Sequence, residues 1–396
     1  MNFLFWKSKQ KEKTIAIFDI GSDSVGGAIA KINTKDNFPH IIKSVRSEIS
    51  FHQGTDLDVL LKNMIMALAD SARLLYESKM GKIDEIFCVL ASPWYISENR
   101  VIKLSKDHSF LFTEKLANDL ITKEIINIKE GYNNKYQDSD NHVELMEYHI
   151  MNVLLNGYNV ENPVGMKSRQ IEMNMIISLT SKTCLDAIKK EFIKKFNDTK
   201  INFSSFMCSS YLAVRDKYIS PDSYLLLDVG GEITEVGIVS KGILISSLSF
   251  PFGKKTFYRF ICTKLDLELR DAKELFNLYI SGSLSERRKK KVAPLFDSIE
   301  KSWGEAFRQC VNDLPHTLAL PSTIFLTADS DVRKWFSETI KKEEYAPILM
   351  TKYNPEVVTL DGQEFLNMCK VTNGTCDPFL MIEAISYSRK EEKKTK

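Results

Sequence analysis

The chain has 396 residues, 43% of them hydrophobic, so it can bury large cores and is long enough for two or more domains. Its net charge is +2, but residues 1–13 and 389–396 each carry +3, which leaves −4 for the body between them. A body of that sign is a poor nucleic-acid surface, and the sequence has neither an apolar run long enough for a membrane-spanning helix nor a secretory signal at its start.

The first thirteen residues combine large apolar side chains with alternating lysines. The apolar residues and the first lysine are Phe3, Leu4, Phe5, Trp6 and Lys7. Such side chains enter the boundary of a bilayer while lysines meet anionic lipid, so the segment predicts a membrane foot. A disordered start, or a tail folded onto the body, is the alternative. So short a foot contributes at most roughly a few kcal/mol, and it would hold only where a polymer links several copies.

Two strand-to-turn motifs, about two hundred residues apart, carry the most information. Residues 15–22 (IAIFDIGS) and 224–231 (YLLLDVGG) each join an apolar run to an aspartate and then to glycine, where the backbone turns tightly. Glycine lets N–H groups approach an anion, and an aspartate can hold a hydrated Mg²⁺. We therefore predict a duplicated α/β core that grips a nucleotide from both sides of a cleft.

The residues predicted to contact the phosphates are Asp19, Gly21, Ser22, Ser24, Asp228, Gly230 and Gly231. Asp19 and Asp228 are also the predicted Mg²⁺ ligands, through water. The alternative for both aspartates is a plain turn residue that ends a strand.

Hydrophobic periodicity and glycine or proline stops predict the other elements of the first half. The strongest helix covers residues 56–79, where Leu60, Met64 and Leu68 recur at a spacing of four and leucines 61, 68 and 75 at a spacing of seven. A second helix is predicted at 113–130, with Gly131 as its stop, and a third at 183–196. The predicted strands are 25–32, 86–91, 100–104, 145–155 and 171–179. Residues 84–180 are therefore expected to form a compact unit inserted into the first domain.

The second half begins at the strand of the second motif. The meander is expected to continue through strands 235–239 and 243–250, and one further strand is predicted at 323–326. The predicted helices are 254–264, 270–279, 292–312, 331–341 and a short closing helix, 378–386. The charge run 287–291 (RRKKK) indicates a solvated loop or helix start, with contact to an anionic membrane or acidic partner as the alternative. No sequence repeat is visible, but the two turns imply a structural one.

Together these features resemble the FtsA/PilM group of bacterial actin-like proteins, with FtsA as the more similar member. Besides the two turns, the resemblance rests on residues 162–166 (NPVGM), similar to the end of the insert called 1C in FtsA, and on Asp377-Pro378 before the final helix. It runs from about residue 14 to 387. It implies an α/β, actin-like (ribonuclease-H-like duplicated) ATPase fold with an inserted 1C-type α+β subdomain.

The resemblance also implies domain boundaries. The implied segments are 14–83, 181–220 and 373–388 for subdomain IA, 84–180 for the insert, 221–372 for subdomains IIA and IIB, 1–13 for the foot and 389–396 for a basic tail.

Seven dispersed cysteines without a CxxC pair indicate reduced thiols, neither disulfides nor zinc ligands. We therefore expect a cytoplasmic protein at the cytoplasmic face of the cell membrane.

For partners, the resemblance implies self-association into polymers and recruitment of other proteins. In FtsA the recruited partner is the FtsZ C-terminal tail, bound by the subdomain that falls here near 250–320. In PilM the insert docks the N-terminal peptide of a pilus inner-membrane protein. FtsA ends in an amphipathic helix, whereas this chain ends in a basic stretch, and PilM-like chains often begin with an apolar-plus-basic segment. The pilus role therefore stays open.

Several departures from the family pattern predict a weakened nucleotide site. Gly231 is followed by Glu232 where the family has glycine, and a carboxylate beside a triphosphate repels it. Ser24 stands where lysine is frequent, and residues 328–330 (ADS) replace a glycine-rich nucleobase turn. The helix segment that touches the nucleoside in the family reads AKELF at 272–276. No acid lies between residues 201 and 215 to orient an attacking water.

The sequence thus predicts an FtsA-like, membrane-associated scaffold of bacterial cell division that tethers FtsZ, binds ATP and Mg²⁺ weakly and hydrolyses little or no ATP. A PilM-like component of type IV pilus assembly is the first alternative. An actin-fold kinase or ATPase is the second, and it would require intact glycines in the second turn.

Overall fold

The computed structural model describes residues 12–33, 38–52, 54, 56–135, 142–312, 320–342 and 354–395, with side chains as far as residue 390. Residues 1–11 of the predicted membrane foot, which include Phe3, Leu4, Phe5, Trp6 and Lys7, lie outside these residues. The last two residues of the predicted foot, Glu12 and Lys13, belong to the first strand instead. No helix within the described ranges combines the length and the apolar character needed to cross a bilayer.

The first half is built on a six-stranded sheet with the order β15-β3-β2-β1-β4-β9. β1 (Glu12–Ile20), β2 (Ser24–Asn33) and β3 (Pro39–Glu48) form an antiparallel meander. β4 (Glu85–Leu90) runs parallel to β1, β9 (Lys200–Ser205) parallel to β4, and β15 (Lys370–Val371) parallel to β3. The pairing of distant segments makes this sheet the frame of the first half.

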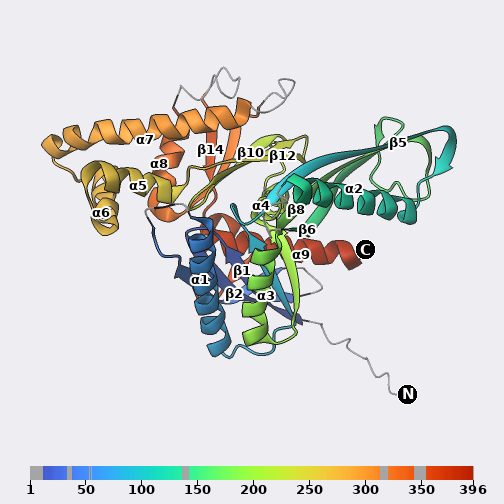
Figure 1. The fold of residues 1–396 in the computed structure, drawn as a ribbon, viewed down its shortest axis with the longest axis horizontal. Helices are drawn as coiled ribbons and strands as arrows, with labels where there is room; N and C mark the ends of the chain where they lie inside the picture. Colours follow the sequence, from blue (N-terminus) through green and yellow to red (C-terminus); the bar gives the residue numbers. More distant parts are fainter. Residues whose placement is uncertain are drawn as a thin grey trace, which may run out of the picture.

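Two pairs of helices cover the two faces of this sheet (Figure 1). α1 (Leu57–Glu77) and α3 (Lys182–Phe196) lie on one face, where the Phe18 ring of β1 packs 4.7 Å from Phe192. α4 (Phe206–Lys217) and α9 (Pro378–Thr395) lie on the other face, where Phe87 of β4 packs 5.3 Å from Tyr387. Since both faces are covered, β1 and β4 read as nearly continuous apolar runs.

The second half repeats the same topology. Its five-stranded sheet has the order β12-β11-β10-β13-β14. Its strands are β10 (Tyr224–Val229), β11 (Thr234–Ser240), β12 (Ile243–Phe250), β13 (Thr323–Ala328) and β14 (Glu356–Thr359). Again an antiparallel meander of three strands is followed by two parallel strands. The structural duplication predicted from the two turns is therefore present without a visible sequence repeat.

Strand β10 joins two apolar cores. Leu225, Leu227 and Val229 face the core of the second half, which four helices cover. These are α5 (Lys254–Leu265), α6 (Leu269–Ile280), α7 (Glu286–Asn312) and α8 (Ser330–Ile340). Tyr224 and Leu226 face the other way, into the core that holds α4, α9 and the first sheet. Because side chains alternate along a strand, one strand contributes to both cores and fixes the two halves together.

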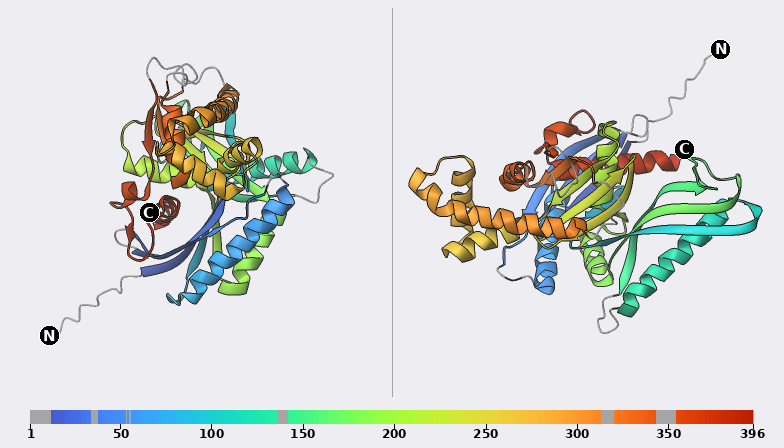
Figure 2. Two further views of the ribbon diagram at one scale, coloured as in Figure 1. Left: turned by 90° about the vertical axis from the view of Figure 1, so that its left-hand side faces the viewer. Right: turned by 90° about the horizontal axis from the view of Figure 1, so that it is seen from above.

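The insert forms an arm on one side of the central body, and α6 and α7 extend on the other side (Figures 1 and 2). It comprises β5 (Ile96–Leu111), α2 (Glu114–Lys135), β6 (Val143–Leu155), β7 (Tyr158–Asn159) and β8 (Lys167–Ser181). The four strands pair antiparallel in the order β5-β8-β6-β7, and α2 packs on one face over a core of its own.

Several predicted boundaries differ from the structure. Gly131 does not end α2, because Tyr132 beyond it packs on the core of the insert and donates to Glu98 Oε1 at 2.5 Å. This packing outweighs the cost of a helical glycine, about 1 kcal/mol. β4 belongs to the first sheet, so the inserted sheet begins at Ile96 and not at residue 84. The charge run 287–291 is helical, within α7.

The chain returns from the second half to the first through a single helical turn, η2 (Gly362–Phe365), followed by β15 and α9. Gly362 has no room for a side chain, since an added Cβ would overlap the carbonyl group of Cys376. Phe365 and Cys369 are buried in the core of the first half. The first half therefore resumes before residue 373, and α9 extends beyond the predicted end at 386.

Candidate functional site

The two predicted turns contact each other, as the prediction of a shared site requires. The Glu232 N–H donates to Ser22 Oγ at 2.9 Å. A Cβ added to Gly231 would lie 2.6 Å from the Asp23 nitrogen and 2.8 Å from the Ser22 carbonyl carbon. The backbones of the two turns are therefore in direct contact, with no room between them for a phosphate group.

The backbone N–H groups of the turns bond within the protein. Gly21 N–H donates to Ser24 O at 3.1 Å, and Gly230 N–H donates to Ile233 O at 3.0 Å. Together with the bond from Glu232 to Ser22, three such donors are occupied. A phosphate-binding loop presents these groups to its ligand, so both turns here are closed upon themselves.

Helix α5 begins against the second turn. The N–H groups of Lys254 and Lys255 donate to the carbonyl oxygens of Gly230 and Gly231 at 2.9 and 2.7 Å. These contacts satisfy donors that a helix N-terminus otherwise leaves open. Gly253 is required by the close approach, since a Cβ there would lie 2.5 Å from both carbonyl oxygens. The packing fixes two consecutive lysines at the edge of the cleft.

Lys254 occupies the centre of a carboxylate cluster. Its Nζ lies 2.9 Å from Asp23 Oδ2, 2.9 Å from Asp329 Oδ2 and 3.2 Å from Asp331 Oδ2. Asp23 follows the first turn, whereas the other two belong to the second half. Burial lowers the pKa of Lys254, but the three carboxylates outweigh burial and raise it, so the ammonium stays charged.

Lys255 and Arg259 add further contacts between the halves. Lys255 is 2% exposed, and its Nζ donates to Ser22 O at 2.9 Å and to Ile49 O at 3.4 Å. Arg259 binds both oxygens of Glu232 at 2.6 and 2.7 Å, and its Nε donates to the carbonyl oxygen of His52 at 2.9 Å. Glu232, predicted to repel a triphosphate, is thus neutralised by an arginine of the chain itself.

Asp19 is held by an arginine as well. Arg46 Nη2 lies 2.8 Å from Asp19 Oδ2 and 2.7 Å from Asp377 Oδ2, and Nη1 donates to Ser24 Oγ at 2.8 Å. Burial raises the pKa of Asp19 to about 6, although Arg46 opposes that rise. Two residues predicted for the nucleotide, Asp19 and Ser24, are therefore engaged by Arg46.

Asp228 lies beneath the second turn as a buried acid. It is 5% exposed, and its Oδ1 has no hydrogen-bond partner among the described residues. Burial raises the pKa of Asp228 well above its usual range, and the neighbouring Glu235 raises it further. Metal ligands must be deprotonated, so a neutral Asp228 is a poor ligand for Mg²⁺.

In this arrangement the residues present do not fit a metal-bound nucleotide. The sequence predicted correctly which two turns meet, but it did not predict the residues that hold the cleft between them closed. Those residues are Asp23, Arg46, Lys254, Lys255, Arg259 and Asp377. One signal was available: basic residues are unfavourable at a helix N-terminus, so two lysines at the start of a predicted helix required nearby anions.

The helix segment predicted to touch a nucleoside lies in α6. Its Lys273 and Glu274 line an open groove of about 660 Å³ together with Leu269 and Asn277 of the same helix. A second cavity, of about 870 Å³, lies between the C-terminal ends of α1 and α3 and is lined by Leu75 and Phe196, among others. Neither cavity contains a residue of the two turns.

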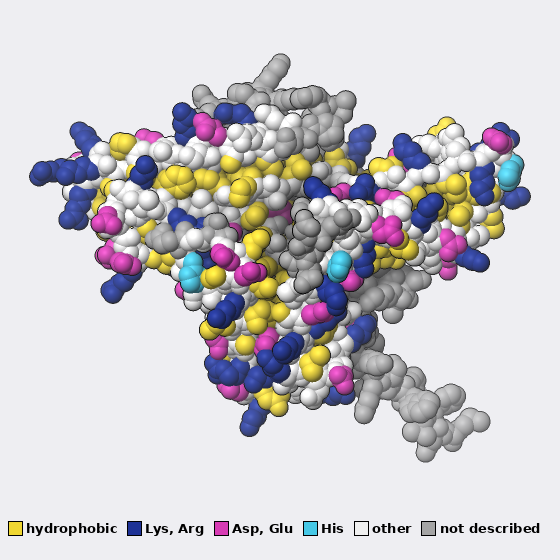
Figure 3. Space-filling view, viewed as in Figure 1, with side chains coloured by type: hydrophobic (Ala, Val, Ile, Leu, Met, Phe, Trp, Pro, Cys, Tyr) yellow, Lys and Arg dark blue, Asp and Glu magenta, His cyan; other side chains and the backbone are white. Residues whose placement is uncertain are grey.

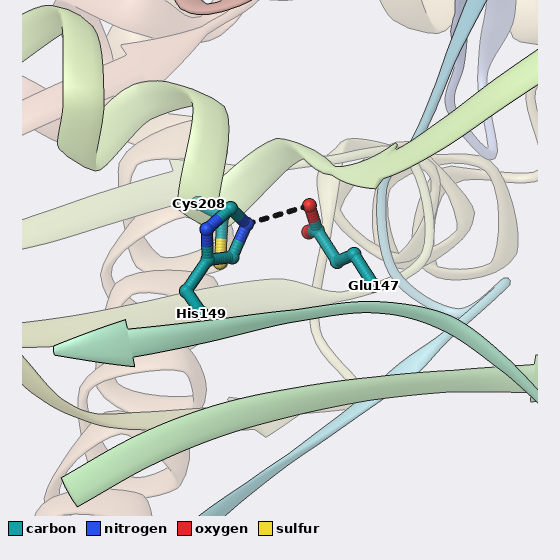
Figure 4. A group of neighbouring side chains, drawn as sticks. All are labelled: Glu147, His149 and Cys208. Atoms are coloured by element: carbon teal, nitrogen blue, oxygen red, sulfur yellow. Dashed lines mark hydrogen bonds and ion pairs between the residues drawn. The ribbon is translucent and has the colours of Figure 1, made fainter. Parts of the chain in front are cut away.

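Glu147, His149 and Cys208 form a cluster whose potential ligand atoms all lie within 4.8 Å of one another (Figure 4). Glu147 nevertheless already accepts from an ammonium, since Lys390 Nζ lies 2.7 Å away, and it accepts three bonds from Ser204 and Ser205 at 2.6–2.8 Å. Burial raises the pKa of Cys208 well above its usual range, so it stays a thiol. We therefore interpret this cluster as a structural joint between the insert, α4 and α9.

Basic side chains gather at the outer end of the projection formed by α6 and α7, on the side opposite the insert (Figure 3). The five consecutive basic residues 287–291 are all exposed in the first turns of α7. The predicted solvated helix start fits this exposure.

No protein-family model and no curated protein matches the chain. Among solved structures, it is similar to a PilM-PilN type IV pilus biogenesis complex, with a TM-score of 0.61, 13% identity and coverage of 94% of this chain and 97% of that chain. The ethanolamine utilization protein EutJ from Carboxydothermus hydrogenoformans gives a TM-score of 0.44 at 10% identity, covering 95% and 89%. A Bacteroides thetaiotaomicron protein of unknown function with an actin-like ATPase fold gives 0.41 at 11%, covering 98% and 99%.

At these identities the similarity shows the fold alone. The chain has the actin-like ATPase fold, and that prediction is confirmed. A closer kinship with FtsA, and a nucleotide role for the seven turn residues, stay predictions.

Proposed function

We propose that the chain is a membrane-associated, actin-fold scaffold that binds a protein partner and hydrolyses little or no ATP. The observation that carries the proposal is the cleft itself, in which Lys254 and Arg46 neutralise the carboxylates that would otherwise serve a metal. A fold kept intact around such a cleft is better suited to holding partners than to phosphoryl transfer.

Nucleotide binding would require the two turns to separate and the Lys254 ammonium to leave Asp23. We therefore expect weak affinity for Mg-ATP at most. Titration calorimetry with Mg-ATP, together with a phosphate-release assay, tests this expectation. Steady ATP turnover would contradict the scaffold function and favour the ATPase alternative.

Two partners are candidates. Similarity to a structure from a PilM-PilN complex, over nearly the full length of both chains, supports a PilM-like role in pilus assembly with an inner-membrane protein as partner. The resemblance of residues 162–166 and of Asp377-Pro378 to FtsA supports a role in cell division, with the FtsZ tail as partner.

The two roles are separated by titrating the full chain with two peptides, an FtsZ C-terminal tail and the N-terminal peptide of a pilus inner-membrane protein. Scrambled peptides of the same composition serve as controls. Saturable binding of one peptide assigns the role. Failure of both peptides would contradict the proposed partners.

The membrane association is tested by pelleting with anionic vesicles. Deletion of residues 1–10 removes all the apolar residues of the predicted foot but spares β1, in which Glu12 pairs with Lys31 at 2.9 Å and Lys13 with Glu85 at 3.0 Å. We expect the shortened chain to pellet less than the full chain. Equal pelleting would remove the foot from the proposal.

A further inference from the structure

The contacts that close the cleft come largely from one end of helix α5. Lys254 contacts Asp23, Lys255 contacts the carbonyl oxygens of Ser22 and Ile49, and Arg259 contacts the carbonyl oxygen of His52. All of these acceptors belong to the first half, whereas α5 belongs to the second. The start of α5 therefore reaches across the cleft and binds the first turn directly.

Because these two lysines are buried, breaking their contacts has a large free-energy cost. Lys254 is 8% exposed and Lys255 is 2% exposed. A buried ammonium is tolerated only when it is paired and hydrogen-bonded. The described contacts of Lys255 are to Ser22, Ile49 and Asp23 of the first half, so separation of the halves would leave its ammonium to water alone.

The chemistry around Lys254 is that of a cation site. Three carboxylate oxygens lie within 3.2 Å of one Nζ, and they come from both sides of the cleft. Carboxylate oxygens from several segments are the ligands that divalent cations take. Here a side chain of the protein supplies the positive charge.

We propose that Lys254 and Lys255 are built-in counterions that hold the two halves closed, so that closure of the cleft requires neither metal nor nucleotide. The inference rests on the non-hydrolysing part of the proposed function and extends it. It makes the closed state a constant property of the chain, and regulation by ATP is then excluded.

Hydrogen exchange of the full chain, read at the two turns, tests the proposal. The informative amide is that of Glu232, which donates to Ser22 across the cleft. In the wild type we expect strong protection that Mg-ATP leaves unchanged. Lys254→Met and Lys255→Met should each raise exchange at this amide roughly tenfold or more, because opening no longer breaks a buried cation contact.

A matched control is Lys129→Met, which removes a lysine paired at 2.7 Å with Glu144 inside the insert. It should leave exchange at both turns unchanged.

In Lys254→Met the carboxylates of Asp23, Asp329 and Asp331 lose their cation, so millimolar Mg²⁺ should restore protection there. The same addition should not rescue Lys255→Met, whose lost contacts are mainly to backbone carbonyl groups.

Two results would overturn the proposal. One is a change in protection of the wild-type turns on addition of Mg-ATP. The other is exchange in Lys254→Met and Lys255→Met equal to that of Lys129→Met. Should either lysine variant fail to fold, Asp23→Asn keeps both lysines and should still raise exchange at the Glu232 amide. The wild-type measurement with and without Mg-ATP needs no variant and tests the proposal by itself. Failure of the proposed function would appear separately, as steady phosphate release from ATP or as failure of both peptides to bind.

Discussion

Glu147 lies where the inserted sheet meets α4 and α9, and it is the acceptor that joins them. Its carboxylate accepts from the Ser205 N–H at 2.6 Å and from Lys390 Nζ at 2.7 Å. Burial raises the pKa of Glu147, but Lys390 and His149 outweigh burial and hold it well below its usual range. A charged, buried carboxylate in this position depends on all of its partners at once.

Replacing Glu147 by glutamine keeps its shape and removes its charge. We expect Glu147→Gln to lower the free energy of unfolding by roughly 3 kcal/mol, because Lys390 is left without its carboxylate. Urea unfolding measures the change. The control is Asp186→Asn, which breaks an exposed pair with Lys182 and should cost less than about 0.5 kcal/mol. Losses of equal size in the two variants would contradict the assigned role.

Glu85 provides a pH dependence with a definite sign. Burial disfavours its ionised form, but hydrogen bonds from Lys13 and Tyr387 outweigh burial and lower its pKa from 4.5 to about 2. The stabilisation from ionised Glu85 is complete above pH 4.5 and is lost as the pH falls through 2. The difference in unfolding free energy between wild type and Glu85→Gln should therefore shrink as the pH falls across this range. A difference that stays constant would show that Glu85 has an ordinary pKa.

At the residue scale, the sequence predicted which turns meet but not what lies between them. Apolar runs that end in Asp-x-Gly are local patterns, so Asp19 and Gly230 could be chosen from neighbours along the chain. The pairing of Arg46 with Asp377 spans 331 positions and leaves no local trace. Since charged residues are common, only the fold decides which of them become partners.

Elements with a clear period were predictable, and the others were not. α1 buries one face and exposes the other, which gives apolar residues at spacings of four and seven. In α4 every residue from Phe206 to Val214 is buried, serines included, so no polar face marks the helix. Strand β3 was missed because much of it is polar and only partly buried. Burial on all sides and partial burial both remove the period on which prediction relies.

Two glycines, one inside a helix and one just before a helix, should respond oppositely to alanine. Gly131 lies inside α2 with nothing within 4 Å of an added Cβ, so Gly131→Ala should raise the free energy of unfolding by about 0.5–1 kcal/mol. Gly253 precedes α5, where a Cβ would meet two carbonyl oxygens at 2.5 Å, so Gly253→Ala should lower it by roughly 1–3 kcal/mol. Thermal and urea unfolding measure both. The same sign for both variants would contradict the packing at the second turn.

At the scale of the whole molecule, the cores predict how the protein opens. One core contains strands of the first sheet and residues of β10, whereas the insert has a core of its own. In hydrogen exchange at increasing denaturant, amides of β1 and β10 should share one opening free energy. Amides of β8 in the outer part of the insert should exchange at a lower one. Separate values for β1 and β10 would show that the shared core does not couple the halves.

The thiols of this chain allow site-selective labelling. Six of the seven cysteines are buried, and Cys376 alone is partly exposed, at the seam where its carbonyl group packs on Gly362 just before α9. A maleimide dye should therefore attach at one place in the native protein, next to the Asp377 that holds Arg46. Its fluorescence would report on the seating of the last helix in real time, without any engineered label.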